Sequence, residues 1–316
     1  SFDQTPADAG IADLFVFPSR DGHVYGFDPT KREMVWKRSL GKFGDRFSNL
    51  HVRNGWIYLG TVDNALVCFH AKTGKRKWPP LAARGPVEAA PTTSDDLRHV
   101  AVANLLGEVI VVDDATGREI GKFTTENEIV AAPLFAGEFL LVGSRDSYVY
   151  GYNLAEGRIV FITELRSEVV TDPVRHQNDG IFATLDGRVH RVDTANRTIA
   201  WSVKVAETLI ASLETSPDRI YCALANGTVL GLDPATGLVS KRWTIGTSTP
   251  GGMVLHRDIL YIGYRDGRLV AWDVRKERPA WTWQADSAIH TSPLVINGRL
   301  FIACNSGTLQ VLEILD

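Results

Sequence analysis

Residues 226–243 read NGTVLGLDPATGLVSKRW, and this stretch decides the fold. It opens with an Asn-Gly pair, continues through an apolar run, and reaches a second turn, Asp-Pro-Ala-Thr-Gly, before a segment that ends on Trp243. Asn-Gly or Asp-Gly between apolar runs indicates a tight β-hairpin, which we expect to be a type I′ turn with positive φ at both central residues. In the second turn, the Asp can accept backbone N–H groups and the Gly can adopt the left-handed conformation. The stretch therefore predicts two successive short strands, each preceded by a turn of defined chemistry.

The same pattern recurs eight times along the 316 residues. The second members of the tight-turn pairs are Gly22, Asn64, Gly107, Ser147, Gly187, Gly227, Gly267 and Gly307. Their spacings are 42, 43, 40, 40, 40, 40 and 40 residues. A unit of about 40 residues with four short antiparallel strands is typical of a β-propeller. We predict an all-β chain that forms an eight-bladed β-propeller of four-stranded antiparallel blades. The last blade is expected to be incomplete, or to borrow a strand from residues 1–4.

Composition limits the domain organisation and the kind of partner. We expect residues 1–316 to form a single propeller domain, excised from a larger protein or processed from a precursor, because the sequence starts at Ser1 without a leader. Lys and Arg number 34 against 37 Asp and Glu, a net charge of −3. This balance argues against nucleic acid as a partner, since sequence-independent binding needs a basic excess. No apolar run approaches the roughly 18 to 20 residues that span a bilayer.

The three cysteines, Cys68, Cys222 and Cys304, are too few and too scattered for a disulfide framework. We expect each to be a buried residue of a strand that packs as a small hydrophobe. Unpaired thiols favour a reducing compartment, so a cytoplasmic location within a larger chain is the first expectation and a periplasmic location the alternative.

The second turn carries a family resemblance. Asp-x-x-Thr-Gly followed by Trp resembles the pyrroloquinoline-quinone (PQQ) repeat, and residues 113–117 and 233–237 are nearly intact copies. Looser copies extend the resemblance over the whole chain. It implies a propeller in which one aromatic residue per unit packs between blades, and we assign that role to Trp36, Trp78, Trp201 and Trp281.

The resemblance leaves two classes of function open. Quinoprotein alcohol dehydrogenases carry this repeat and hold PQQ against adjacent half-cystines with a nearby Ca²⁺, but this chain has no adjacent cysteines and no calcium-binding loop. It also lacks zinc-site histidine spacing, a nucleophile elbow and a phosphate-binding loop. We therefore expect no enzyme activity, cofactor or metal. The non-enzymatic relatives are BamB-type assembly scaffolds and bacterial sensor domains, which implies a scaffold for protein–protein interaction or ligand sensing. A PQQ-binding dehydrogenase-like domain with a ligand on the propeller axis is the alternative.

Arginines recur beside the tight turns and predict a binding surface. Two residues before the second turn member, units one, four and seven carry Arg20, Arg145 and Arg265, and loops between blades add Arg46, Arg84 and Arg166. Guanidinium groups around the axis would bind a protein partner with an acidic segment, or a small anionic ligand, through bidentate hydrogen bonds. The alternative is that each turn arginine pairs with the Asp beside it or points into water. Carboxylates on the same loops are expected to be solvated rather than catalytic: Glu88, Glu126, Glu128, Glu168, Glu207 and Asp286.

Overall fold

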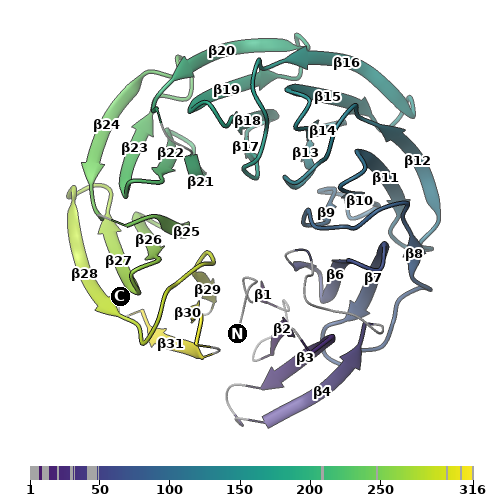
Figure 1. Ribbon diagram of the computed structural model, residues 1–316, viewed down its shortest axis with the longest axis horizontal. Coiled ribbons are helices and arrows are strands. Elements are labelled where there is room, and N and C mark those ends of the chain that lie inside the picture. Colours follow the sequence, from purple (N-terminus) through teal and green to yellow (C-terminus); the bar gives the residue numbers. More distant parts are fainter. Residues whose placement is uncertain are drawn as a thin grey trace. The chain divides into compact units, whose positions relative to one another are not determined.

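The computed structural model describes residues 7–8, 14–19, 21–28, 31, 33–40, 48, 50–207, 210–246, 248–296, 298–306 and 308–314. These residues form eight antiparallel sheets, seven of four strands and a last one of three (Figure 1). No helix occurs in these ranges, so none of them provides a helix that could cross a membrane. The predicted fold class, an all-β eight-bladed β-propeller with an incomplete last blade, is confirmed. Residues 1–4, which were the alternative source of a strand for that blade, lie outside the described residues.

The blades form two compact units, each of four blades. In the first unit, blade 1 contains β1 (Ala7–Asp8), β2 (Phe15–Ser19), β3 (His23–Asp28) and β4 (Glu33–Ser39), and blade 2 contains β5 (His51–Arg53), β6 (Trp56–Thr61), β7 (Ala65–His70) and β8 (Leu81–Ala82). Blade 3 contains β9 (Thr92–Thr93), β10 (His99–Ala103), β11 (Glu108–Asp113) and β12 (Glu119–Thr124), and blade 4 contains β13 (Leu134–Ala136), β14 (Phe139–Gly143), β15 (Tyr148–Asn153) and β16 (Arg158–Glu164).

The second unit continues the same order. Blade 5 contains β17 (Val174–His176), β18 (Asp179–Ala183), β19 (Arg188–Asp193) and β20 (Thr198–Lys204), and blade 6 contains β21 (Ile210–Ser216), β22 (Arg219–Leu224), β23 (Thr228–Leu232) and β24 (Val239–Thr244). Blade 7 contains β25 (Pro250–His256), β26 (Ile259–Tyr264), β27 (Arg268–Asp273) and β28 (Arg278–Gln284), and blade 8 contains β29 (Leu294–Ile296), β30 (Arg299–Ala303) and β31 (Leu309–Glu313).

Burial along the strands explains their composition. The second strand of a blade is covered by sheets on both sides, so β14 and β18 are buried along their whole length. The fourth strand alternates between buried and exposed residues, as in β20, because one of its faces meets solvent. The cores therefore lie between blades. Between blades 5 and 6, for example, Ile181 and Val189 belong to the same apolar cluster as Ile220 and Leu230.

The tight turns form hairpins as predicted, but the predicted turn type is wrong. In the tight turns that the structure describes, positive φ occurs only at the second member of the pair, as at Gly107 (73°), Gly187 (83°) and Gly267 (85°). The Gly107 N–H donates to the carbonyl of Asn104 (3.1 Å), and Asn104 in turn donates to the carbonyl of Glu108 (3.0 Å). This is a three-residue loop in which a type I turn precedes a left-handed Gly. The loop has three residues rather than the two of a type I′ hairpin. Its two central turn residues can therefore keep negative φ, and only the third residue, the glycine, needs positive φ.

The aromatic residues in or just before the fourth strands pack against the next blade, which confirms their structural role for three of the four predicted tryptophans. Trp36 packs on Gly74, Trp78 on Gly117 and Trp201 on Gly237. The indole Nε1 of Trp201 donates to the carbonyl of Pro234 (3.0 Å). A Cβ added at Gly237 would lie 2.6 Å from Trp201 Cε3, so only glycine leaves room for the ring. Trp281 is only partly buried, in the cluster between blades 7 and 8.

All three cysteines are buried and none forms a disulfide, which confirms the prediction. Desolvation raises the pKa of the Cys222 thiol far above its ordinary value. Because the thiolate is the reactive form, a thiol in this environment is inert and packs as an apolar group.

Candidate functional site

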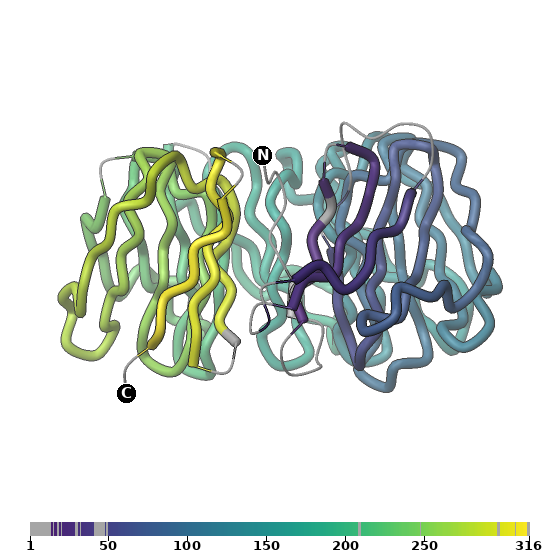
Figure 2. Tube along the Cα trace, turned by 90° about the horizontal axis from the view of Figure 1, so that it is seen from below, coloured from purple at the N-terminus to yellow at the C-terminus, as the bar shows by residue number. Residues whose placement is uncertain are grey.

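In a meander of antiparallel strands, successive connections alternate between the two edges of the sheet (Figure 2). The turns between second and third strands and the loops between blades therefore share one edge, which we call the tight-turn edge. The turns with the Thr-Gly sequence lie on the opposite edge, the Thr-Gly edge. Backbone hydrogen bonds connect turns and loops on the tight-turn edge: Arg145 N–H donates to the carbonyl of Glu128 (3.0 Å) and Arg265 N–H to that of Thr249 (3.0 Å). Both predicted arginine positions thus anchor a loop from the preceding blade through their backbone.

The side chain of Arg145 lies between two carboxylates. Its Nη1 is 2.9 Å from Glu128 Oε2 and its Nε is 2.8 Å from Glu168 Oε2. The hydrogen bonds with Glu128 and then Glu168 raise the pKa of the guanidinium. The neighbouring Asp146 instead accepts a hydrogen bond from the Tyr150 hydroxyl (2.7 Å). Arg145 therefore neither pairs with the adjacent Asp nor points into water; it joins the loops on both sides of blade 4.

Arg84 has a different environment on the same edge of the first unit. Its backbone N–H donates to Glu108 Oε2 (2.7 Å), whereas 72% of its side chain is exposed. Glu108 itself is 1% exposed and also bonds Lys122 Nζ (2.6 Å) and Asn104 Nδ2 (2.8 Å). Burial alone would raise the pKa of Glu108, but the Arg84 N–H and Lys122 outweigh it and hold the pKa below its usual range. Glu108 directly follows Gly107 of the third tight turn. This position in the sequence was the signal that could have identified it, and sequence reasoning missed it.

The other predicted arginines are not brought together. Arg166 and Arg265 are exposed and form no ion pair within the described part of the chain. Arg84, Arg145 and Arg166 belong to the first unit and Arg265 to the second. Arg20 and Arg46 lie outside the described residues. The convergence of all six guanidinium groups around an axis remains a prediction.

An exposed leucine lies beside Arg84. Leu106, in the tight turn of blade 3, is 61% exposed, and its Cγ would lie 2.6 Å from a Cβ at Gly85. The leucine therefore covers the backbone next to Arg84. We call Arg84, Gly85 and Leu106 the Arg-Leu patch. The Arg84 Nε lies 3.6 Å from Glu108 Oε1, but most of the side chain stays exposed. An exposed apolar side chain beside an exposed arginine is a combination that marks protein interfaces, where arginine is enriched.

A half-buried carboxyl in blade 6 was also missed. Glu214 lies on the innermost strand β21, opposite Tyr221 in the register with β22. Burial raises the pKa of its carboxyl from an ordinary value near 4.5 to about 7, and a hydrogen bond from the Thr215 backbone lowers it only in part. No group of three or more metal-binding side chains occurs among the residues that the structure describes. The raised pKa of Glu214 makes stability depend on pH.

Glu214→Gln should stabilise the protein at alkaline pH. The folded state holds the Glu214 proton up to about pH 7, whereas the unfolded state releases it near pH 4.5. Wild-type stability should therefore decrease as pH rises through this window, and the glutamine variant should lack this decrease. We expect the free energy of unfolding of the glutamine variant to exceed that of the wild type by about 1 to 3 kcal/mol at pH 8, and to equal it at pH 4. Urea unfolding of both proteins at the two pH values measures it. If the two proteins differed in unfolding free energy by the same amount at pH 4 and pH 8, the raised pKa of Glu214 would be wrong.

Comparison with known proteins finds others of the same fold. The sequence profile of a family described as outer membrane protein assembly factor BamB matches residues 20–104, 106–257 and 225–316. Proteins of that name from Moranella endobia and Yersinia pestis are each 20% identical over 90% of this chain, covering 81% and 78% of their own lengths. The structure of BamB from Moraxella catarrhalis superposes with a TM-score of 0.80 at 17% identity, covering 98% of this chain and 96% of that one. The computationally designed Ika8 protein gives 0.85 at 16% identity, covering 98% and 95%.

Proposed function

Because the chain belongs to the family of outer membrane protein assembly factor BamB, we propose that it is a non-catalytic scaffold that binds a protein partner during outer membrane protein assembly. The relatives carry the name of an assembly factor, which favours the predicted interaction scaffold over the PQQ-dependent alternative. Those names also favour the periplasmic location over the cytoplasmic one that the unpaired cysteines suggested. In this location the three thiols would be protected from oxidation by their burial.

We propose the tight-turn edge of the first unit as the partner-binding surface. The observation that carries this proposal is the Arg-Leu patch, where Leu106 and the guanidinium of Arg84 are exposed together. Arg166, on the loop after blade 4, adds a second exposed cation on the same edge. Apolar contact with Leu106 would supply affinity, while the two arginines would select a partner with acidic residues. Arg145 is already paired with two glutamates and would contribute less.

Charge reversal on this edge should disrupt partner binding. In the native organism, deleting the gene should reduce the amount of folded outer membrane β-barrel protein, measured by heat-modifiable migration in gels. The wild-type gene should restore it, and Arg84→Glu with Arg166→Glu should not, because each lost charge contact weakens binding about tenfold. Arg118→Glu, at an exposed arginine on the Thr-Gly edge of blade 3, is the matched control and should restore assembly.

The two parts of the proposal can fail separately. Unchanged levels of folded outer membrane protein after deletion would contradict a role in assembly. Full restoration by the double charge reversal would contradict the choice of surface and leave the assembly role standing.

A further inference from the structure

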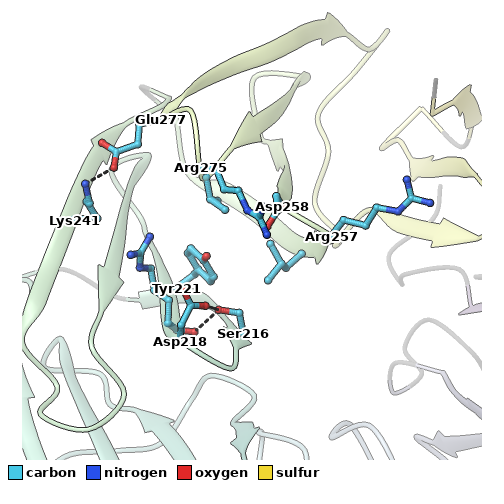
Figure 3. Close-up of a pocket in the computed structure, with 11 residues that line it drawn as sticks. Ser216, Asp218, Tyr221, Lys241, Arg257, Asp258, Arg275 and Glu277 are labelled. Atoms are coloured by element: carbon cyan, nitrogen blue, oxygen red, sulfur yellow. Dashed lines mark hydrogen bonds and ion pairs between the residues drawn. The ribbon is translucent and has the colours of Figure 1, made fainter. Parts of the chain in front are cut away.

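A cleft opens between blades 6 and 7 on the Thr-Gly edge, away from the arginines discussed above. Its volume is about 380 Å³, and charged residues from both blades line it. Figure 3 shows Lys241 and Glu277 joined at one side of the cleft, and Ser216 joined to Asp218 at another. Asp258 and Arg275 form a third pair, with Oδ1 and Nε 2.9 Å apart. The cleft is therefore a polar site whose walls come from two neighbouring blades of the same unit.

The cleft exists because the packing pair used at other blade junctions is replaced here. Between blades 5 and 6, Trp201 fills this space and packs on Gly237 of the Thr-Gly turn. Forty residues later, Lys241 and Glu277 occupy the same two positions of the repeat and form an ion pair instead. Glu277 retains the left-handed φ of 53° that glycine adopts without cost. Lysine thus replaces tryptophan at this position, and the space that the indole ring fills at the preceding junction stays open.

A second exchange removes a close ion pair that is present one blade earlier. Between blades 5 and 6, Asp179 at the start of β18 pairs with Arg191 of β19 (2.7 Å). The corresponding positions of blade 6 are Arg219 and Gly231. The Arg219 side chain lies across Gly231, where a Cβ would be 2.7 Å from its Cδ. Arg219 forms no ion pair with any residue in the described ranges. The guanidinium of this cleft-lining arginine is thus not held in a close ion pair like the one that Asp179 and Arg191 form one blade earlier, and Asp218 and Glu277 act on it only from beyond ion-pair distance.

We propose that this cleft binds the carboxylate of an acidic side chain on an extended segment of a protein partner, with Arg219 as the group that binds the carboxylate. A planar guanidinium binds a carboxylate through two parallel hydrogen bonds. The acidic groups that line the cleft favour a carboxylate carried by a peptide over a free phosphate. Asp218, Asp258 and Glu277 would repel a free phosphate dianion more strongly than a singly charged carboxylate, and their oxygens can accept the backbone N–H groups that accompany a side chain on a peptide. This site is separate from the tight-turn edge and does not depend on the proposed assembly function.

Peptide titration followed by nuclear magnetic resonance tests the site. The probe is a blocked pentapeptide with one glutamate between alanines, added to the whole chain while the Arg219 Nε–Hε and Gly231 amide signals are recorded. Both signals should shift saturably, and the same peptide with glutamine should bind about tenfold more weakly. Arg219→Gln should abolish the shifts. Arg242→Gln, which removes an exposed arginine on β24 of the same blade, is the matched control and should retain them.

A second variant fills the cleft. Lys241→Trp together with Glu277→Gly restores the Trp-on-Gly pair of the preceding junction. It should raise the melting temperature by a few degrees, since it buries an indole and removes a non-glycine residue from the left-handed region, and it should prevent peptide binding. Unchanged binding by Arg219→Gln, equal binding of the glutamine peptide, or equal binding of inorganic phosphate would each overturn the proposal. So would peptide binding to a folded, cleft-filled variant.

Discussion

Replacing Trp201 by alanine should lower the free energy of unfolding by about 3 to 5 kcal/mol, the usual cost of removing a large buried aromatic side chain. Trp201 is 9% exposed and donates a hydrogen bond to the Pro234 carbonyl of the next blade. Its loss would leave a cavity beside Gly237 and remove one of the two side-chain hydrogen bonds that the Pro234 carbonyl accepts, the other coming from Arg191 Nη1. Chemical denaturation at equilibrium measures the loss.

The matched control is Trp281→Ala, at the same position of blade 7. Trp281 is only partly buried, so the expected loss is roughly half as large because it scales with the apolar area removed from water. Binding to a partner should be unchanged in both variants at a temperature where they remain folded. If Trp201→Ala removed binding without moving the unfolding transition, the packing role of Trp201 would be wrong.

Asp114→Ala should be comparably destabilising, by about 3 to 5 kcal/mol, because it leaves a buried charge without its partner. Asp114 Oδ2 lies 2.6 Å from Lys77 Nζ and its Oδ1 accepts the Tyr58 hydroxyl at 2.6 Å, across the junction of blades 2 and 3. The Lys77 and Asp114 side chains are only 14% and 12% exposed. Lys77 also lies 4.7 Å from the centre of the Trp56 ring, so it cannot move into water without leaving that contact.

Two further variants isolate the charge effect. Asp113→Ala removes the adjacent carboxylate, which binds the Thr116 backbone at an exposed turn, and should cost only about 1 kcal/mol. Lys77→Met combined with Asp114→Leu replaces both charges and should recover most of the stability lost in Asp114→Ala. Thermal unfolding of the four proteins separates these outcomes. A loss below about 1 kcal/mol in Asp114→Ala would show that Lys77 is hydrated in the folded state.

The propeller was predictable because its signals are local and repeated. The spacing of the tight turns, the Asp-x-x-Thr-Gly turns and the Trp residues each depend on a few neighbouring residues, and eight copies make chance agreement negligible. The turn type was predicted wrongly because one inserted residue changes a type I′ turn into a type I turn with a left-handed Gly. The dipeptide Asp-Gly is compatible with both.

Contacts between neighbouring blades decided the rest. Arg145 was recognisable from sequence, but its partners lie 17 and 23 residues away, on the loops before and after its blade. No periodicity predicts that these side chains meet, because the meeting depends on rotamers and on the space left between blades. The cleft beside Arg219 has the same origin. Lys241 and Glu277 are ordinary surface residues in the sequence, and only the packing of blade 6 against blade 7 turns the missing Trp-on-Gly pair into a cavity. Local turn and strand chemistry therefore determines which fold forms, whereas the shape and charge of each site follow from side chains that only tertiary packing brings together.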